Sequence, residues 1–165
     1  FIGFIINPAN YLKTQGLNMS IKEQLNHDIK EAMRAREKEL LNTLRLISAA
    51  VKQIEVDERV EVDEERMLVI LDKMTKQRKE SIAQFEKANR DDLVAQEQFE
   101  LNLIAKYLPE PLSAAEIETL IQDAINATGA SQIADMGKVM GLVKGKVQGR
   151  ADMAQVSQLI KSKLG

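Results

Sequence analysis

The sequence predicts an all-α protein in which an N-terminal bundle of about four helices precedes a small C-terminal domain of three helices. Three observations favour this fold class. Apolar residues recur at spacings of three and four along most of the chain. Aromatic residues make up only 4% and Trp is absent, so the core must be built from aliphatic side chains, which suit helix packing. The helical pattern stops sharply at two prolines, Pro109 and Pro111, and resumes after them.

Residues 1–18 are expected to be a non-native or upstream extension, with Met19 as the native start. The segment lacks the basic start and the long apolar run of a secretory signal. Directly after Met19, Ser20 and Glu23 have the spacing of a capping box, which begins a helix. The alternative is an N-terminal arm that packs its apolar side chains on a neighbouring molecule, through Phe1, Phe4 and Ile5.

Residues 19–108 are expected to form the N-terminal helical domain. The first apolar stripe follows the capping box, and a second runs as far as Ile54. The charged segment 55–62 then interrupts the pattern and is expected to be a loop. Asp63 begins a third helix whose first turn is acidic, as the helix dipole favours. A turn at 89–92 separates this helix from a fourth.

Residues 109–165 are predicted to be a separate three-helix domain. The two prolines cannot continue the preceding helix, and Ser113 begins a second capping box directly after them. A stop followed so closely by a start is typical of a domain boundary. Three short helices follow, delimited by Gly129, Gly149 and the capping residue Asp152.

Positive charge is concentrated at the C-terminal end of the chain. Residues 109–135 hold five acids and no Lys or Arg, whereas residues 136–165 hold six bases and one acid. Clustered bases beside helix ends and glycines are the usual electrostatic footprint of phosphate binding. The alternative is a set of solvated lysines on a small amphipathic helix. The candidate nucleic-acid-binding residues are Lys138, Lys144, Lys146, Gly149 and Arg150.

The glycines of this region recur every fourth residue, at Gly137, Gly141, Gly145 and Gly149. On a continuous helix they would line one side and let another backbone approach closely. Alternatively, the last two would loosen the helix end and present backbone N–H groups to an anion at the start of the next helix.

A secondary basic cluster consists of Lys76, Arg78 and Lys79. Arg78 occupies a position where the apolar stripe requires a buried residue, so it is expected to be half-buried and paired with a core acid. Lys76 and Lys79 are expected to lie on a solvated face. The single histidine, His27, falls on the polar flank of its helix and is also expected to be solvated.

Three segments resemble the YqeY family of small bacterial proteins: LRLISAAVKQIE (44–55), KQRKESIAQFEKANRDDLVAQEQFELNLIAKYLPEPLS (76–113) and DMGKVMGLVKGKVQGRADMAQVSQLIKSKL (135–164). The resemblance extends over residues 19–165. Cys is absent, which removes disulfides and fits a reducing compartment. Together these observations predict a cytoplasmic protein of bacterial type.

The same resemblance links the chain to the C-terminal tail of GatB, a subunit of the tRNA-dependent amidotransferase. The GatB tail has a comparable glycine, Val-Met pair and Gly-basic-Ala turn, which here are Gly137, Val139-Met140 and Gly149–Asp152. The tail is a helical domain that helps to hold tRNA. The resemblance therefore implies tRNA as a partner, with an aminoacyl-tRNA synthetase or amidotransferase as a further one.

The sequence lacks the residues that a glutamine-dependent amidotransferase reaction needs. There is no Cys, no adjacent Ser pair and no phosphate-binding glycine loop, and one His cannot form a multi-His metal site. We therefore expect no catalytic residue, cofactor, metal or membrane partner, although the family is linked to carbon–nitrogen ligases that use glutamine. The expected function is a non-catalytic tRNA-associated accessory module. The alternative is a helical protein–protein adaptor, and the oligomeric state stays open.

Overall fold

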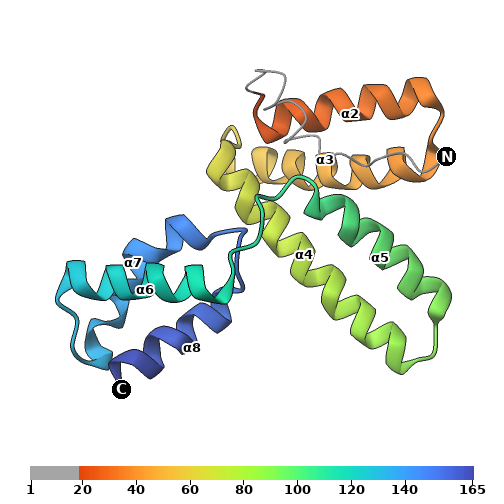
Figure 1. The fold of residues 1–165 in the computed structure, drawn as a ribbon. Helices are drawn as coiled ribbons and strands as arrows, with labels where there is room; N and C mark the ends of the chain where they lie inside the picture. The colour runs from red at the N-terminus through yellow and green to blue at the C-terminus, as the bar shows by residue number, and fades with distance from the viewer. Residues whose placement is uncertain (1–18) are drawn as a thin grey trace. The chain divides into compact units, whose positions relative to one another are not determined.

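The computed structural model describes residues 19–165, and this part of the chain is all-α with no strand, which confirms the predicted fold class (Figure 1). The expectation for segment 1–18 lies outside the described residues. The elements are α2 Ile21–Ala35, α3 Lys38–Glu58, α4 Glu64–Lys87, α5 Asp91–Ala105, α6 Ala114–Thr128, the short 3-10 helix η1 Ile133–Asp135, α7 Met136–Val147 and α8 Met153–Leu164.

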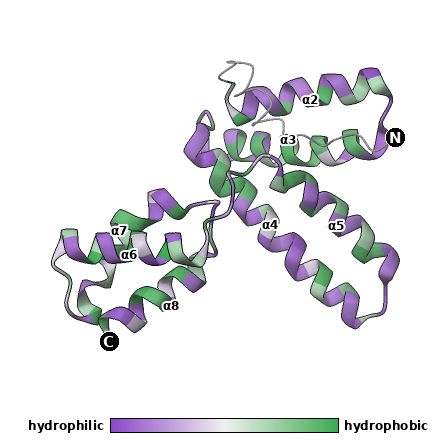
Figure 2. Ribbon diagram, in the orientation of Figure 1, coloured by the Kyte–Doolittle hydropathy of each residue, from purple (hydrophilic) through white to green (hydrophobic). Residues whose placement is uncertain are grey.

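The chain divides between Leu108 and Pro109 into two compact units. Unit 1 contains α2 to α5, and unit 2 contains α6 to α8. Each unit has its own cluster of buried apolar side chains. Hydrophobic and hydrophilic residues alternate along the helices, as amphipathic packing requires (Figure 2).

Unit 1 is held together by aliphatic side chains from all four of its helices. In Figure 1, α4 and α5 form a long antiparallel hairpin whose far end extends away from α2 and α3. The core lies where the near half of this hairpin meets α2 and α3. Its central side chains are at most 2% exposed and include Leu25, Leu44, Ile47, Leu71 and Ile104.

Helix α3 is longer than predicted, and the expected loop at 55–62 is wrong for its first half. The helix continues to Glu58 and ends at Arg59, which has a left-handed φ of 55°. Glu55 stabilises this extension because it forms an ion pair with Lys22 and accepts a hydrogen bond from the Val62 N–H. Such contacts between distant residues are invisible in a sequence pattern, and residues 59–63 alone separate α3 from α4.

The predicted helix starts of unit 1 are confirmed. Ser20 and Glu23 form a reciprocal capping box at the start of α2. Asp63 caps α4 by accepting a hydrogen bond of 2.8 Å from the Arg66 N–H.

Tyr107 ties the end of α5 to α2. Its hydroxyl donates a hydrogen bond to the Asp28 carboxylate, which also accepts one of 2.8 Å from Gln24. Burial raises the pKa of Tyr107 and the hydrogen bond to Asp28 raises it further, so the phenol stays a proton donor. Tyr107 is 5% exposed, and this contact fixes the last residues of unit 1.

Replacing Tyr107 by Phe is expected to lower the free energy of unfolding by about 1–3 kcal/mol, because Asp28 loses a charge-assisted donor at a half-buried position. Urea unfolding followed by circular dichroism measures this change. Thr119→Ala is the control, because its exposed hydroxyl only donates to the Ala115 carbonyl within α6. A loss no larger than that of the control would contradict the assigned role of Tyr107.

Unit 2 packs α6, α7 and α8 around a core rich in valine. Its helices begin and end largely as predicted: Ser113 accepts a hydrogen bond from the Glu116 N–H, Gly129 has a left-handed φ of 66°, and Asp152 caps α8. The most deeply buried side chains are at most 1% exposed and recur every fourth residue within α7 and within α8: Ile121, Val139, Val143, Val147, Val156 and Ile160.

Candidate nucleic-acid interface

The predicted nucleic-acid-binding residues all lie on α7 or in the turn that follows it. Lys138 is in the first turn of α7, and Lys144 and Lys146 are in its last turn. The two lysines of the last turn are exposed. Gly149 and Arg150 lie between α7 and α8 and are half-buried.

Part of the positive charge of unit 2 is neutralised by neighbouring carboxylates. Lys138 lies 3.7 Å from Asp135, and Lys163 lies 3.1 Å from Glu118. The pKa of Asp135 is lowered, mainly by a hydrogen bond from the Ser131 backbone N–H and to a smaller extent by Lys138.

Three other lysines of unit 2 have no carboxylate within salt-bridge distance among residues 19–165, namely Lys144, Lys146 and Lys161. Their charge is therefore available to a ligand. The last turn of α7 contributes two of the three.

Arg150 is occupied by contacts within unit 2. Its Nε–H donates a hydrogen bond of 3.0 Å to the Glu110 carbonyl, and its own carbonyl accepts one of 2.8 Å from the Leu112 N–H. Gly149 has a φ of 73°, a left-handed conformation that favours glycine and turns the chain out of α7. The structure thus gives these two residues structural contacts that the sequence pattern did not reveal.

The start of α8 is unsuited to the expected anion site. The carboxylate of Asp152 accepts a hydrogen bond of 2.9 Å from the Ala154 N–H. A negative side chain therefore already occupies the position where an anion would meet the free N–H groups of the helix. The helix end is not loosened at Gly145, which stays within α7, and Asp152 caps α8 as predicted.

The glycine face of α7, defined as Gly137, Gly141 and Gly145, is exposed. Apart from its chain neighbours and the nearby backbone of α7 itself, a Cβ atom added at any of the three would meet no atom within 4 Å. The buried residues of α7 fall on the opposite side: Val139, Val143 and Val147. Gly149 lies outside the helix, so it does not continue this face. Within residues 19–165 no backbone packs on the glycine face.

The secondary basic cluster separates into one paired residue and two solvated ones. Arg78 of α4 lies 2.6 Å from Glu100 and 3.6 Å from Glu97, both on α5, and its side chain is only 20% exposed. This agrees with the expected half-buried Arg paired with a core acid. Lys76 and Lys79 are exposed, as is His27 on α2.

Replacing Arg78 by Gln is expected to destabilise the protein by about 3 kcal/mol, because Glu100 would be left as an uncompensated charge in the hairpin. Thermal and urea unfolding measure the loss. The matched controls Lys76→Gln and Lys79→Gln should change stability by at most about 0.5 kcal/mol. If all three variants unfolded alike, Arg78 would not be a structural ion-pair residue.

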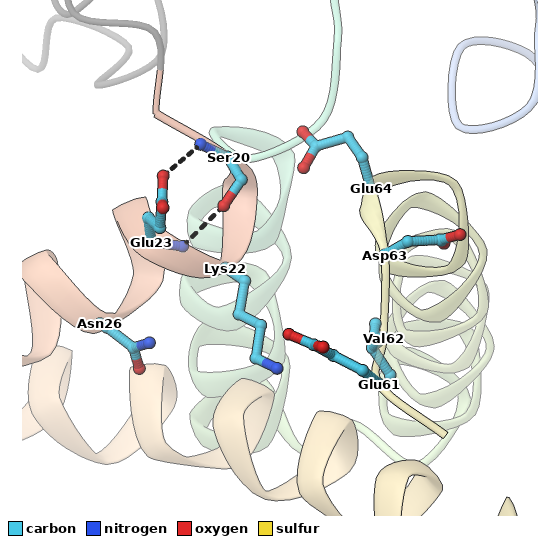
Figure 3. A pocket seen from close by; sticks show the side chains of 8 residues that line it. All are labelled: Ser20, Lys22, Glu23, Asn26, Glu61, Val62, Asp63 and Glu64. Carbon is cyan, nitrogen blue, oxygen red and sulfur yellow. Dashed lines mark hydrogen bonds between the residues drawn. The ribbon is translucent and has the colours of Figure 1, made fainter.

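An open groove of about 380 Å³ lies in unit 1 between the start of α2 and the connection from α3 to α4. Figure 3 shows acidic side chains on both sides of it. No group of three or more His, Asp or Glu side chains in the described chain could hold a metal ion. The lining residues are Ser20, Lys22, Glu23, Asn26, Glu61, Val62, Asp63 and Glu64. The lining includes neither His nor Cys, and no pattern in the sequence predicts this groove.

None of the helices in residues 19–165 is both long and apolar enough to cross a membrane. Fold and surface together define an all-α, two-unit protein whose smaller unit carries unpaired lysines beside exposed glycines. The family model described as "Yqey-like protein" matches residues 22–164, and the chain belongs to this family.

Curated relatives share the name "Altered inheritance of mitochondria protein 41, mitochondrial". The protein from Pyrenophora tritici-repentis is 30% identical over 94% of this chain and 87% of its own length. The protein from Vanderwaltozyma polyspora is 36% identical over 62% of this chain and 57% of its own length. The protein from Eremothecium gossypii is 39% identical over 56% of this chain and 51% of its own length. For the last two, the match spans little more than half of the relative.

These relatives contradict the expectation of a cytoplasmic protein of bacterial type. They come from fungi, and their names describe them as mitochondrial. The error arose because the absence of Cys fits any reducing compartment and does not distinguish one from another.

Proposed function

We propose that the protein is a non-catalytic accessory module that binds tRNA through unit 2. The observation that carries this proposal is the set of unpaired cations, Lys144, Lys146 and Lys161. Double-helical RNA is recognised by its shape and phosphate backbone, which requires basic side chains in the protein rather than aromatic side chains that stack on nucleobases. Unit 2 contains no Phe, Tyr or Trp, in agreement with this mode of binding.

The glycine face of α7 supports the proposal independently of charge. Each glycine in a helix interior costs about 1 kcal/mol relative to Ala. Packing within the described chain offers no reason for Gly137, Gly141 and Gly145, because each has room for a Cβ. Close approach of a ligand to the α7 backbone would account for glycine at these positions. Lys144 lies beside them, where its ammonium group can contact a negatively charged ligand.

The resemblance to the GatB tail supports tRNA as the ligand, and the names of the relatives support action in mitochondria. The Gly137 and Val139-Met140 positions on which that resemblance rests form the first part of α7. In the proposed function Lys144, Lys146 and Lys161 neutralise phosphates while unit 1 orients the module or meets a protein partner.

Changing Lys144, Lys146 and Lys161 together to Glu is expected to weaken tRNA binding at least about tenfold, because repulsion replaces the phosphate contacts. Filter binding at several salt concentrations measures the dissociation constant. For the unchanged protein the log–log salt slope should be about −2 to −3, as three neutralised phosphates predict.

The matched control is the triple variant Lys30→Glu, Lys38→Glu and Lys52→Glu, which makes the same charge change on exposed positions of unit 1. It should retain most of the affinity. Equal losses in both variants would contradict a site on unit 2. If tRNA did not bind at all, while a protein partner was retained at high salt, the adaptor alternative would hold.

Replacing Gly141 by Ala is expected to have opposite effects on stability and binding. The helix should gain about 1 kcal/mol, because Ala is the better helix former and its Cβ meets open space. Affinity for tRNA should fall, because the methyl group keeps the ligand away from the backbone of α7. Thermal unfolding and filter binding test the two effects separately, and unchanged affinity would exclude the glycine face from the interface.

A further inference from the structure

The turn Gly149–Asp152 holds the segment by which the chain enters unit 2. Arg150 makes both contacts: its carbonyl accepts from the Leu112 N–H at 2.8 Å, and its Nε–H donates to the Glu110 carbonyl at 3.0 Å. Leu112 also packs against the core of unit 2. Main chain and side chain of one residue therefore hold three successive residues, 110–112, in place.

Each other residue of the turn supports this arrangement. Gly149 supplies the left-handed φ of 73° that turns the chain after α7. The N–H groups of Arg150 and Ala151 both donate to the Val147 carbonyl, at 2.9 and 3.1 Å, which ties the turn to the end of the helix. Ala151 packs on the core, and Asp152 caps α8. The orientation of Arg150 is thus determined on both sides.

On the side of unit 1 the chain is fixed up to Leu108. The hydroxyl of Tyr107 is bonded to Asp28, and Leu108 packs against the core cluster of unit 1. Its N–H donates to the Ala105 carbonyl at 3.3 Å. Only Pro109 lies between the last residue fixed in unit 1 and the first carbonyl held in unit 2.

We infer that Arg150 is a positioning residue, which clamps residues 110–112 to unit 2 and confines the joint between the units to the backbone torsions of Leu108, Pro109 and Glu110. The φ of Pro109 is fixed by its ring, and Pro111 restricts the conformation of Glu110 before it. This role differs from the predicted phosphate contact of Arg150. It does not depend on whether unit 2 binds tRNA.

Nuclear magnetic resonance of the full ¹⁵N-labelled chain tests the clamp. Arg150→Ala removes the hydrogen bond to the Glu110 carbonyl and keeps the backbone carbonyl that accepts from Leu112. Loosening of the segment by the loss of this one bond is expected to speed amide hydrogen exchange of Leu112 by about two- to tenfold. The heteronuclear NOE of Glu110 should fall, because its carbonyl is released. Lys146→Ala removes the same charge from an exposed position and should leave both values unchanged.

Equal exchange and NOE values in Arg150→Ala and Lys146→Ala would overturn the inference. Arg150→Lys provides a milder variant if unit 2 of the Ala variant does not fold, which the protection of the Val156 and Ile160 amides reports. Lys keeps the charge but lacks the planar Nε–H donor, so Leu112 should still exchange faster than in the unchanged protein. Wild-type exchange in both Arg150 variants, with tRNA affinity lost in the Ala variant and restored by Lys, would instead assign a phosphate contact.

Discussion

The burial of a valine stripe against two neighbouring helices is the interaction on which unit 2 depends. Val139, Val143 and Val147 are at most 1% exposed, and the partly buried Met136 and Met140 of α7 pack against the same core. Fully burying side chains of this size contributes about 1.5–3 kcal/mol each. This packing fixes the rotation of α7 and thereby decides which of its residues meet solvent. The exposure of the glycines and of Lys144 and Lys146 follows from it.

Much of the fold could be predicted from the sequence, because the signals for it are local. Capping residues such as Ser20, Asp63 and Asp152 act on N–H groups two or three positions away, so their spacing alone is informative. The extension of α3 to Glu58 could not be predicted in this way. It depends on the pairing of Glu55 with Lys22, which lies 33 residues earlier in the chain.

The candidate site was less predictable than the fold, because a count of charges does not reveal their partners. Six bases stand in the last thirty residues, but Lys138 and Lys163 are paired with acids and Arg150 is bonded to backbone. The position of Arg78 within an apolar stripe was the informative exception, because a charge at a buried position requires a compensating acid. A solvated lysine gives no such signal in the sequence. Whether a carboxylate lies beside it, and hence whether it is available to a ligand, is seen only in the structure.

The two separate cores have a consequence for how such a protein can evolve. Unit 2 extends from Pro109 to Gly165, and its buried side chains form a cluster of their own. The clamp at Arg150 also holds residues 110–112, the segment by which the chain enters unit 2. Because unit 2 has its own hydrophobic core, gene fusion could join it to a larger enzyme without changing the packing of either core.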